Sequence, residues 1–174
     1  MSKSQPGRQL RWVIIAIVVM IIVGVFGRFR LLPPALKGKP APDFQLPILD
    51  GGLYTLSEDT ATVVVLDFWA SWCGPCRVSL PRMEQLHRWA KAEKKSVAIY
   101  CINQGEEPDR ILDVWQEHDL TMPVLLDTMY SVSVDYEIHA IPQTVIITNK
   151  KIVDVHIGTS NVQSLKKQIE RLLD

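Results

Sequence analysis

Two patterns of hydrophobic positions divide the chain. Residues 12–27 form an unbroken apolar run that contains no charged residue and has no polar face. From residue 40 onward, short apolar runs alternate with segments in which apolar residues recur at helical spacing. The first pattern is typical of a helix in a membrane, and the second is typical of strands that alternate with amphipathic helices. The sequence therefore predicts one membrane segment followed by one globular domain.

The apolar run predicts a transmembrane anchor at residues 10–29. At about 1.5 Å per residue, residues 12–27 cover about 24 Å, which is less than the roughly 30 Å of a hydrocarbon core. Residues 10–29 are long enough, because Arg11 and Arg28 can extend their charged groups to the membrane surface. A buried core helix is the alternative, and the absence of any polar face in the run disfavours it.

A cleavable signal sequence is another interpretation of this segment. Residues 25–27 offer a small-residue cleavage site, but the apolar run exceeds the usual signal core of about 7–15 residues, which favours an uncleaved anchor. The predicted organisation is a short tail at residues 1–9, the anchor, a Pro-containing linker at residues 30–39 and a domain at residues 40–174.

The patterns within residues 40–174 predict an α/β fold in which a mixed central sheet is flanked by helices. A turn at Asp50-Gly51-Gly52 joins two short strands into an N-terminal hairpin. Residues 63–69 are apolar except for one acid, as expected for a central strand buried on both faces. The hairpin strands are expected at residues 44–46 and 53–56, further strands at 96–102, 123–127, 143–148 and 151–157, and helices at 74–93, from Pro108 onward, at 129–136 and at 162–173.

The charge of the chain is unevenly distributed and excludes one class of partner. Residues 1–39 contain seven basic residues and no acidic residue, whereas residues 40–174 contain 12 basic and 19 acidic residues. An acidic domain repels a phosphate backbone, so we expect no nucleic-acid binding. Three cysteines cannot form a disulfide framework, so the fold is expected to depend on its hydrophobic core.

The candidate chemistry lies where the predicted central strand meets the next helix. The sequence Trp72-Cys73-Gly74-Pro75-Cys76 places two thiols three positions apart on the first turn of that helix, close enough to form a disulfide. Unpaired N–H groups and the helix dipole favour an anion there, so the pKa of Cys73 should fall below that of a free cysteine. We therefore predict that Cys73 attacks a substrate disulfide and that the more shielded Cys76 resolves the mixed disulfide.

Other uses of two cysteines fit the sequence less well. A zinc site needs two more ligands, and neither Cys101 nor the four dispersed histidines form a second pair. Covalent haem attachment needs a histidine after the second cysteine, where Arg77 stands. A purely structural disulfide between such close neighbours would remove little chain entropy. Reversible chemistry of a Cys73–Cys76 disulfide remains, and it requires no cofactor and no metal.

Asp67 is a candidate proton carrier. It is the acid in the predicted central strand, and a buried carboxylate is costly unless it is neutral or functional. Burial should raise its pKa, so Asp67 could accept and return the proton of Cys76 during exchange. A carboxylate that reaches solvent at the edge of the strand is the alternative.

Ile141-Pro142 precedes a predicted strand and has two interpretations. A proline can simply open a strand. A cis peptide bond would instead turn the backbone toward the two cysteines and expose the peptide group of Ile141 for pairing with a substrate strand. The residues by themselves do not separate these interpretations.

These motifs resemble those of the thioredoxin superfamily. Residues 65–76 (Val-Leu-Asp-Phe-Trp-Ala-Ser-Trp-Cys-Gly-Pro-Cys) are similar to its active-site strand and motif. Pro81 matches its helix-kinking proline, and Ile141-Pro142 matches its cis-proline position. Residues 38–44 and the insertion around residues 105–126 resemble the membrane-anchored thiol–disulfide oxidoreductases of the TlpA/ResA type. The resemblance implies a thioredoxin-like fold with an N-terminal hairpin and a central insertion.

The resemblance also implies a function. The domain would reduce disulfides of exported proteins, among them apocytochrome c before haem attachment, at the outer face of a bacterial cytoplasmic membrane. A membrane electron donor would reduce the domain again, and the anchor at residues 10–29 would contact lipid. The substrate-binding surface would include Trp72, Gly74, Pro75, Ile141 and Pro142.

Two residues depart from the TlpA/ResA pattern. Ser79 stands where that group commonly has an acid, and Asp67 stands where many members have asparagine. Both features are closer to general thioredoxins. The Gly-Pro pair between the cysteines also resembles the reducing members of the superfamily.

Two other functions use the same residues. A copper-handling module could bind Cu(I) through both thiolates, although the Gly-Pro spacer is better suited to disulfide exchange. A thiol peroxidase shares the Pro42-Asp43-Phe44 opening, but Ala70 occupies the position of the peroxiredoxin threonine three residues before the reactive cysteine.

The remaining polar residues are expected to have ordinary positions. Cys101 lies in a predicted strand and should be a buried, inert side chain. His139 is expected at the surface. The acids Glu106, Glu107 and Asp109 are expected to be solvated in a loop that favours the start of a helix.

Overall fold

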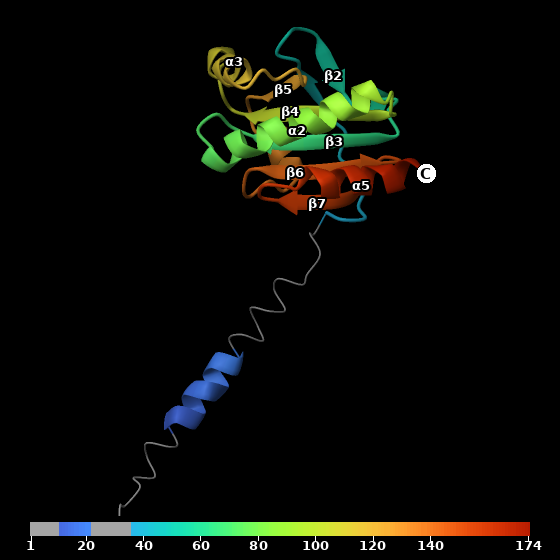
Figure 1. Cartoon of the computed structure of the whole chain (residues 1–174). Coiled ribbons are helices and arrows are strands. Elements are labelled where there is room, and N and C mark those ends of the chain that lie inside the picture. The colour runs from blue at the N-terminus through green and yellow to red at the C-terminus, as the bar shows by residue number, and fades with distance from the viewer. Residues whose placement is uncertain (1–10, 22–35) are drawn as a thin grey trace, which may run out of the picture. The chain divides into compact units, whose positions relative to one another are not determined.

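A computed structural model of the protein describes residues 11–21 and 36–174 (Figure 1). Residues 36–174 form one compact unit. Residues 11–21 are helical, and their large apolar side chains are exposed. Among the described residues, no helix is both long enough and apolar enough to cross a membrane. The predicted anchor at residues 10–29 lies partly outside the described residues, and the tail at residues 1–9 lies entirely outside them.

A five-stranded sheet with the order β5-β4-β3-β6-β7 forms the centre of the globular unit. β3, β4 and β5 are parallel, β6 is antiparallel to β3, and β7 is antiparallel to β6. The strands are β3 (Val63–Trp69), β4 (Val97–Gln104), β5 (Val124–Asp127), β6 (Gln143–Thr148) and β7 (Lys151–Ile157). The mixed sheet and each of its predicted strands are therefore confirmed.

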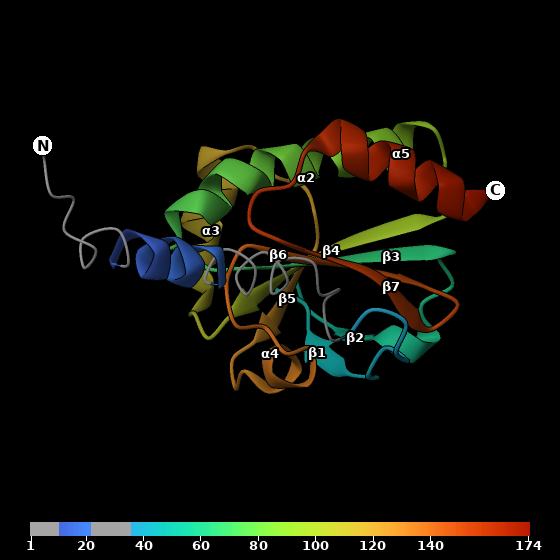
Figure 2. The same cartoon turned by 90° about the horizontal axis from the view of Figure 1, so that it is seen from below.

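Two layers cover the sheet (Figure 2). The helices α2 (Gly74–Ala92), α3 (Pro108–Glu117) and α5 (Val162–Leu173) share one hydrophobic cluster on one face. The second face has its own cluster. It is covered by the hairpin of β1 (Gln45–Pro47) and β2 (Leu53–Thr55), by the short 3-10 helix η1 (Leu56–Glu58) and by α4 (Ser131–Asp135). The predicted N-terminal hairpin and the predicted helices are thus present. The three long helices cover one face of the sheet, and the hairpin with two short helices covers the other.

β3 is the central strand because both of its faces are apolar. All of its residues are buried. Val65 and Trp69 belong to the cluster beneath α2 and α5, whereas Leu66 and Phe68 belong to the cluster on the hairpin side. Because side chains alternate along a strand, Asp67 lies on the same face as Val65 and Trp69. The one acid of β3 is therefore directed toward the layer that contains α2.

The strand directions bring four connections to one edge of the sheet. The carboxyl ends of the parallel strands β3, β4 and β5 lie at the same edge, where Trp69 pairs with Asn103. β6 runs in the opposite direction, so its first residue, Gln143, pairs with Phe68 at that edge. The segments after β3, β4 and β5 and before β6 therefore meet there, although they are far apart in the sequence.

The globular unit begins before residue 40. Leu36 is buried in the cluster on the hairpin side. The N–H of Gly38 donates to the carbonyl of Ile152 at 2.7 Å, and the N–H of Ile152 donates to the carbonyl of Lys39 at 2.9 Å. The sequence assigned residues 36–39 to the linker. They belong to the globular unit instead, because their backbone forms hydrogen bonds with the outer strand β7.

The turn between β6 and β7 follows the two-residue pattern that the sequence predicted. Asn149 and Lys150 have φ values of 50° and 59°, so both lie in the left-handed region. Two such residues are typical of a turn whose twist matches that of the strands on either side. The β6–β7 hairpin is thereby confirmed.

A buried acid in α2 holds the segment between α3 and β5. Glu84 is only 4% exposed. Its carboxylate accepts hydrogen bonds from the N–H of Thr121 at 2.8 Å, the hydroxyl of Thr121 at 2.7 Å and the guanidinium of Arg88 at 2.6 Å. Burial alone would raise the pKa of Glu84, but these hydrogen bonds outweigh it and leave the pKa below its usual range.

Replacing Glu84 with glutamine should destabilise the domain. An amide cannot satisfy all of these donors, so we expect the unfolding free energy to fall by about 2 kcal/mol at neutral pH. The pKa of Glu84 is lower in the folded state than in the unfolded state, so the carboxylate contributes fully above the unfolded value and loses its contribution as the pH falls. Thermal unfolding of both forms across acidic and neutral pH measures the difference, which should shrink in acid. Exposed Glu58, changed to glutamine, is the control and should have no such effect.

Candidate active site

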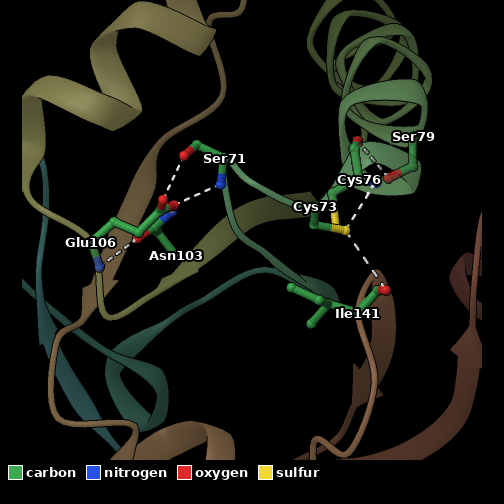
Figure 3. Close-up of a disulfide and its surroundings, with 7 residues drawn as sticks. All are labelled: Ser71, Cys73, Cys76, Ser79, Asn103, Glu106 and Ile141. Carbon is green, nitrogen blue, oxygen red and sulfur yellow. Dashed lines mark hydrogen bonds between the residues drawn. A yellow bond between two sulfur atoms is a disulfide. The ribbon is translucent and has the colours of Figure 1, made fainter.

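The two cysteines of the motif are joined at the N-terminus of α2. Cys73 and Cys76 form a disulfide, with a Cα–Cα separation of 5.2 Å. Cys73 is the N-cap residue of α2, and its sulfur accepts a hydrogen bond from the N–H of Cys76 at 3.2 Å. Pro75 suits the first turn, where a backbone N–H has no partner within the helix. The predicted placement of both thiols at the helix start is confirmed (Figure 3).

The surroundings of the disulfide are asymmetric. Cys73 is 5% exposed and Cys76 is fully buried. Around Cys73 the surface is open, because Trp72 is 71% exposed and Gly74 and Pro75 are also exposed. An incoming thiol or disulfide can therefore reach Cys73 before it reaches Cys76. This is the order of access that the predicted roles of attacking and resolving cysteine require.

The segment before β6 approaches the disulfide from the other side. The Ile141–Pro142 peptide bond is cis, which confirms that part of the second interpretation, whereas pairing of Ile141 with a substrate strand stays a prediction. The carbonyl oxygen of Ile141 lies 3.7 Å from the sulfur of Cys73 (Figure 3). In the disulfide this sulfur carries no hydrogen, so the approach is a contact. In the dithiol form the Cys73 thiol could donate to this oxygen.

Asp67 is buried beneath the layer that contains α2. It is 1% exposed, so the alternative of a solvent-exposed carboxylate is wrong. Its Oδ1 accepts a hydrogen bond from the hydroxyl of Thr144 at 2.8 Å, whereas its Oδ2 has no hydrogen-bond partner among the described residues. Burial raises the pKa of Asp67 to about 7, and the bond from Thr144 opposes this only in part. Asp67 can therefore take up or release a proton near neutral pH.

The third cysteine lies beside Asp67 but apart from the disulfide. Cys101 is opposite Asp67 in the pairing of β3 with β4, and it is completely buried. Burial raises the pKa of the Cys101 thiol well above its usual range, and its sulfur lies 3.7 Å from that of Met122. The side chain is buried as predicted, and a protonated thiol in this position is a poor nucleophile.

The sequence also drew attention to Ser79 and His139. Ser79 is buried in α2, where its hydroxyl donates to the carbonyl of Cys76 at 3.1 Å, so it interacts with its own helix. His139 is exposed, as expected. Within residues 11–21 and 36–174, no group of three or more His, Cys, Asp or Glu side chains could hold a metal ion.

Glu106 lies in the predicted loop before α3, but the expectation that its carboxylate is simply solvated is wrong, because the side chain is half-buried and hydrogen-bonded. Its carboxylate accepts hydrogen bonds from the N–H of Ser71 at 2.6 Å, the hydroxyl of Ser71 and the side-chain amide of Asn103 at 2.8 Å (Figure 3). One sequence signal could have indicated this contact. Glu106 follows the carboxyl end of β4, and the cysteine motif follows the carboxyl end of the parallel neighbour β3. Glu107 and Asp109 are exposed, in agreement with the prediction.

Replacing Asp67 with asparagine should stabilise the oxidised protein above neutral pH. The pKa of Asp67 is about 7 in the folded state and 3.8 ordinarily, so the folded state binds more protons and wild-type stability falls as the pH rises between these values. Ionising the buried carboxyl costs at most roughly 4 kcal/mol, and the unpaired amide of asparagine offsets part of this, which leaves a gain of about 2 kcal/mol.

Unfolding of the oxidised protein at several pH values tests this expectation. The difference between the Asp67→Asn variant and the wild type should grow from acidic to neutral pH and stay level above it. Asp113→Asn, which changes an exposed acid of α3, is the control. A wild type and an Asp67→Asn variant with parallel pH profiles would contradict the raised pKa.

Comparisons with known proteins assign the chain to a family. The Redoxin family matches residues 36–172. The thioredoxin-like protein YneN of Bacillus subtilis is 34% identical over 140 residues, which are 79% of either chain. The thiol–disulfide oxidoreductase ResA of Geobacillus thermodenitrificans is 27% identical over 172 residues, covering 95% of this chain and 98% of ResA.

A solved structure has the same fold. A Chlorobium tepidum protein described as the thiol:disulfide interchange protein DsbE superimposes with a TM-score of 0.71 at 33% identity, covering 79% of this chain and 98% of that protein. The family match spans the whole globular unit apart from its last residues, and it includes the two cysteines and the cis-proline segment. The chain therefore belongs to the Redoxin family, and it is a thioredoxin-superfamily protein of the ResA/TlpA type.

Proposed function

We propose that this protein is a membrane-tethered thiol–disulfide oxidoreductase that reduces disulfides of extracytoplasmic proteins. The observation that carries the proposal is the Cys73–Cys76 disulfide at the N-terminus of α2, with one sulfur accessible and the other buried. Relatives named as thiol–disulfide oxidoreductases support the same activity. The redox group is the pair of cysteines itself, so the reaction needs no further cofactor.

The first step is attack on the substrate disulfide. In the dithiol form, the thiolate of Cys73 is stabilised by the N–H of Cys76 and by the start of α2. It forms a bond to one substrate sulfur, the substrate S–S bond breaks, and the other substrate sulfur leaves as a thiolate that takes up a proton. Exposed Trp72 and the backbone at Ile141 flank Cys73, and we assign to them the contact with the substrate chain.

The second step releases the substrate. Cys76 loses its proton and attacks the sulfur of Cys73, which re-forms the Cys73–Cys76 disulfide and frees the second substrate thiolate to be protonated. Two electrons thus pass from the dithiol to the substrate. The substrate takes up two protons, of which one balances the proton lost by Cys76 and the other balances the proton that Cys73 released when it ionised. We assign to Asp67 the uptake of the Cys76 proton, because Asp67 is directed toward the α2 layer and titrates near neutral pH.

The oxidised domain then needs a dithiol donor. Such a donor would reduce Cys73–Cys76 by the reverse sequence of exchanges and would itself become a disulfide. We assign this role to a membrane electron donor, because the anchor at residues 10–29 would hold the domain at the membrane surface. Exported proteins, including apocytochrome c before haem attachment, are the proposed substrates, and the outer face of a bacterial cytoplasmic membrane is the proposed location.

Removing the resolving thiol should trap the substrate. In the Cys76→Ser variant, Cys73 can attack but the mixed disulfide cannot be resolved, so covalent complexes should accumulate. Reduction of insulin by the same variant should fall at least about tenfold, because each turnover stops at the mixed disulfide. Non-reducing electrophoresis and mass spectrometry of the complexes identify both the substrate and the sulfur that is linked to it.

The Cys73→Ser variant is the matched control for this trap. It retains only the buried thiol and should form no complexes and reduce no insulin. Complexes through Cys76 in this variant would show that the two roles are reversed. A wild-type protein without measurable insulin reduction would contradict the proposed activity itself.

A charge in the middle of the predicted anchor should release the protein from membranes. The Val19→Arg substitution places a cation near the centre of residues 10–29, at a cost of about 2.5–3.5 kcal/mol for insertion. We expect the wild type to resist extraction with alkaline carbonate and the variant to be extracted. Val134→Arg, on the exposed surface of α4, is the control. A mature chain that begins after residue 27 would instead show a cleaved signal sequence.

A further inference from the structure

A carboxylate from the segment after β4 holds the turn that leads into the disulfide. The N–H of Cys73 donates to the carbonyl of Ala70 at 3.2 Å, which closes a turn with Ser71 and Trp72 at its centre. Both the N–H and the hydroxyl of Ser71 donate to the carboxylate of Glu106. Figure 3 shows both bonds ending on that one side chain. The backbone of the turn is therefore attached to a group 35 residues away in the sequence.

Glu106 is itself fixed to the sheet. The side-chain amide of Asn103 donates to its carboxylate at 2.8 Å, and the backbone N–H of Glu106 donates to the side-chain oxygen of Asn103 at 3.2 Å. Asn103 is 1% exposed and pairs with Trp69, the last residue of β3. Asn103 is thus fixed by its place in β4, it positions Glu106 through two hydrogen bonds, and Glu106 in turn binds Ser71.

The attachment matters most when the disulfide is open. In the oxidised protein, the bond to Cys76 limits the movement of Cys73. Reduction removes that bond, and the hydrogen bonds of Ser71 to Glu106 are among the contacts of the turn that do not depend on it. The N–H of Cys76 can stabilise a negative charge on the sulfur of Cys73 only while the two groups stay close together.

We propose that Glu106 is a positioning residue for Cys73, whose carboxylate keeps the Ala70–Cys73 turn in place so that the sulfur remains the cap of α2 in the dithiol form. This inference deepens the proposed exchange reaction and rests on it, because only that reaction requires a reactive dithiol form. Glu106 acts through Ser71 and touches neither the sulfur nor the substrate.

A simple charge effect predicts the opposite result. If Glu106 acted only as a nearby negative charge, it would disfavour the Cys73 thiolate, and its removal would make Cys73 more reactive at neutral pH. If Glu106 positions the turn, its removal lets the sulfur leave the helix N-terminus, and Cys73 becomes less reactive. The sign of the change therefore distinguishes the two explanations.

Alkylation of the reduced full-length chain by iodoacetamide, followed from about pH 5 to about pH 9, measures this reactivity directly. For Glu106→Gln we expect Cys73 to react about fivefold more slowly at neutral pH, with the profile moved to higher pH, since one charge-assisted hydrogen bond is lost. Ser71→Ala should change the profile in the same direction by about twofold, because it removes the hydroxyl bond and keeps the backbone bond. The double variant should be no slower than Glu106→Gln alone, since both changes act on the same contact.

Glu107→Gln is the matched control. It removes an equal charge one residue away from an exposed side chain without a side-chain capping bond, and its profile should equal that of the wild type. A Glu106→Gln profile that equals the wild type, with only a lower Tm, would mean that the contact merely stabilises the fold and would overturn the proposal. A profile moved to lower pH would overturn it in favour of the charge effect.

Two further outcomes keep the test decisive. If Glu106→Gln does not fold, Ser71→Ala decides the question, because an unchanged alkylation profile in that variant contradicts the proposal. If the variants behave as expected but the wild type reduces no protein disulfide, the proposed function fails while the positioning role of Glu106 stands.

Discussion

The chemistry of this domain depends on an unsatisfied helix end. The first backbone N–H groups of α2 have no carbonyl partners within the helix, and the sulfur of Cys73 accepts one of them, that of Cys76, at 3.2 Å. The same N–H that caps the helix in the disulfide would stabilise a thiolate in the dithiol form. The arrangement requires β3 to end at Trp69 and the chain to turn at once into α2, so the buried central strand determines where the reactive sulfur lies.

The sheet supplies the other constraints on that sulfur. Because β3, β4 and β5 are parallel and β6 is antiparallel to β3, the connections at one sheet edge come from four separate parts of the chain. The segment before β6 brings the carbonyl of Ile141 to Cys73, and the segment after β4 brings Glu106 to Ser71. A rigid sheet thereby places the groups around an exposed loop, and the loop does not have to be rigid by itself.

Two acids with little exposed surface have opposite pKa shifts because both their burial and their hydrogen bonds differ. Asp67 accepts a hydrogen bond from Thr144, and burial raises its pKa to about 7. Glu84 also has little exposed surface but lies nearer to solvent, and hydrogen bonds from Arg88 and Thr121 outweigh its burial and lower its pKa. The first acid can therefore exchange a proton near neutral pH, whereas the second remains charged and holds the segment before β5. The balance between burial and the hydrogen bonds that a carboxylate accepts therefore decides in which direction its pKa moves.

The amino-acid sequence by itself determined the features that depend on near neighbours. The order of strands and helices, the two-residue hairpin turn and the placement of Cys73 and Cys76 on a first helical turn follow from local patterns, and the structure agrees with them. The tertiary structure alone decided that Glu106 binds Ser71, that Glu84 binds Thr121 and that residues 36–39 pair with β7. These partners are tens of residues or more apart in the chain, and only the strand order and register bring them within hydrogen-bonding distance. Local pattern carries no information about such distances, because many strand orders satisfy the same alternation of apolar and polar residues.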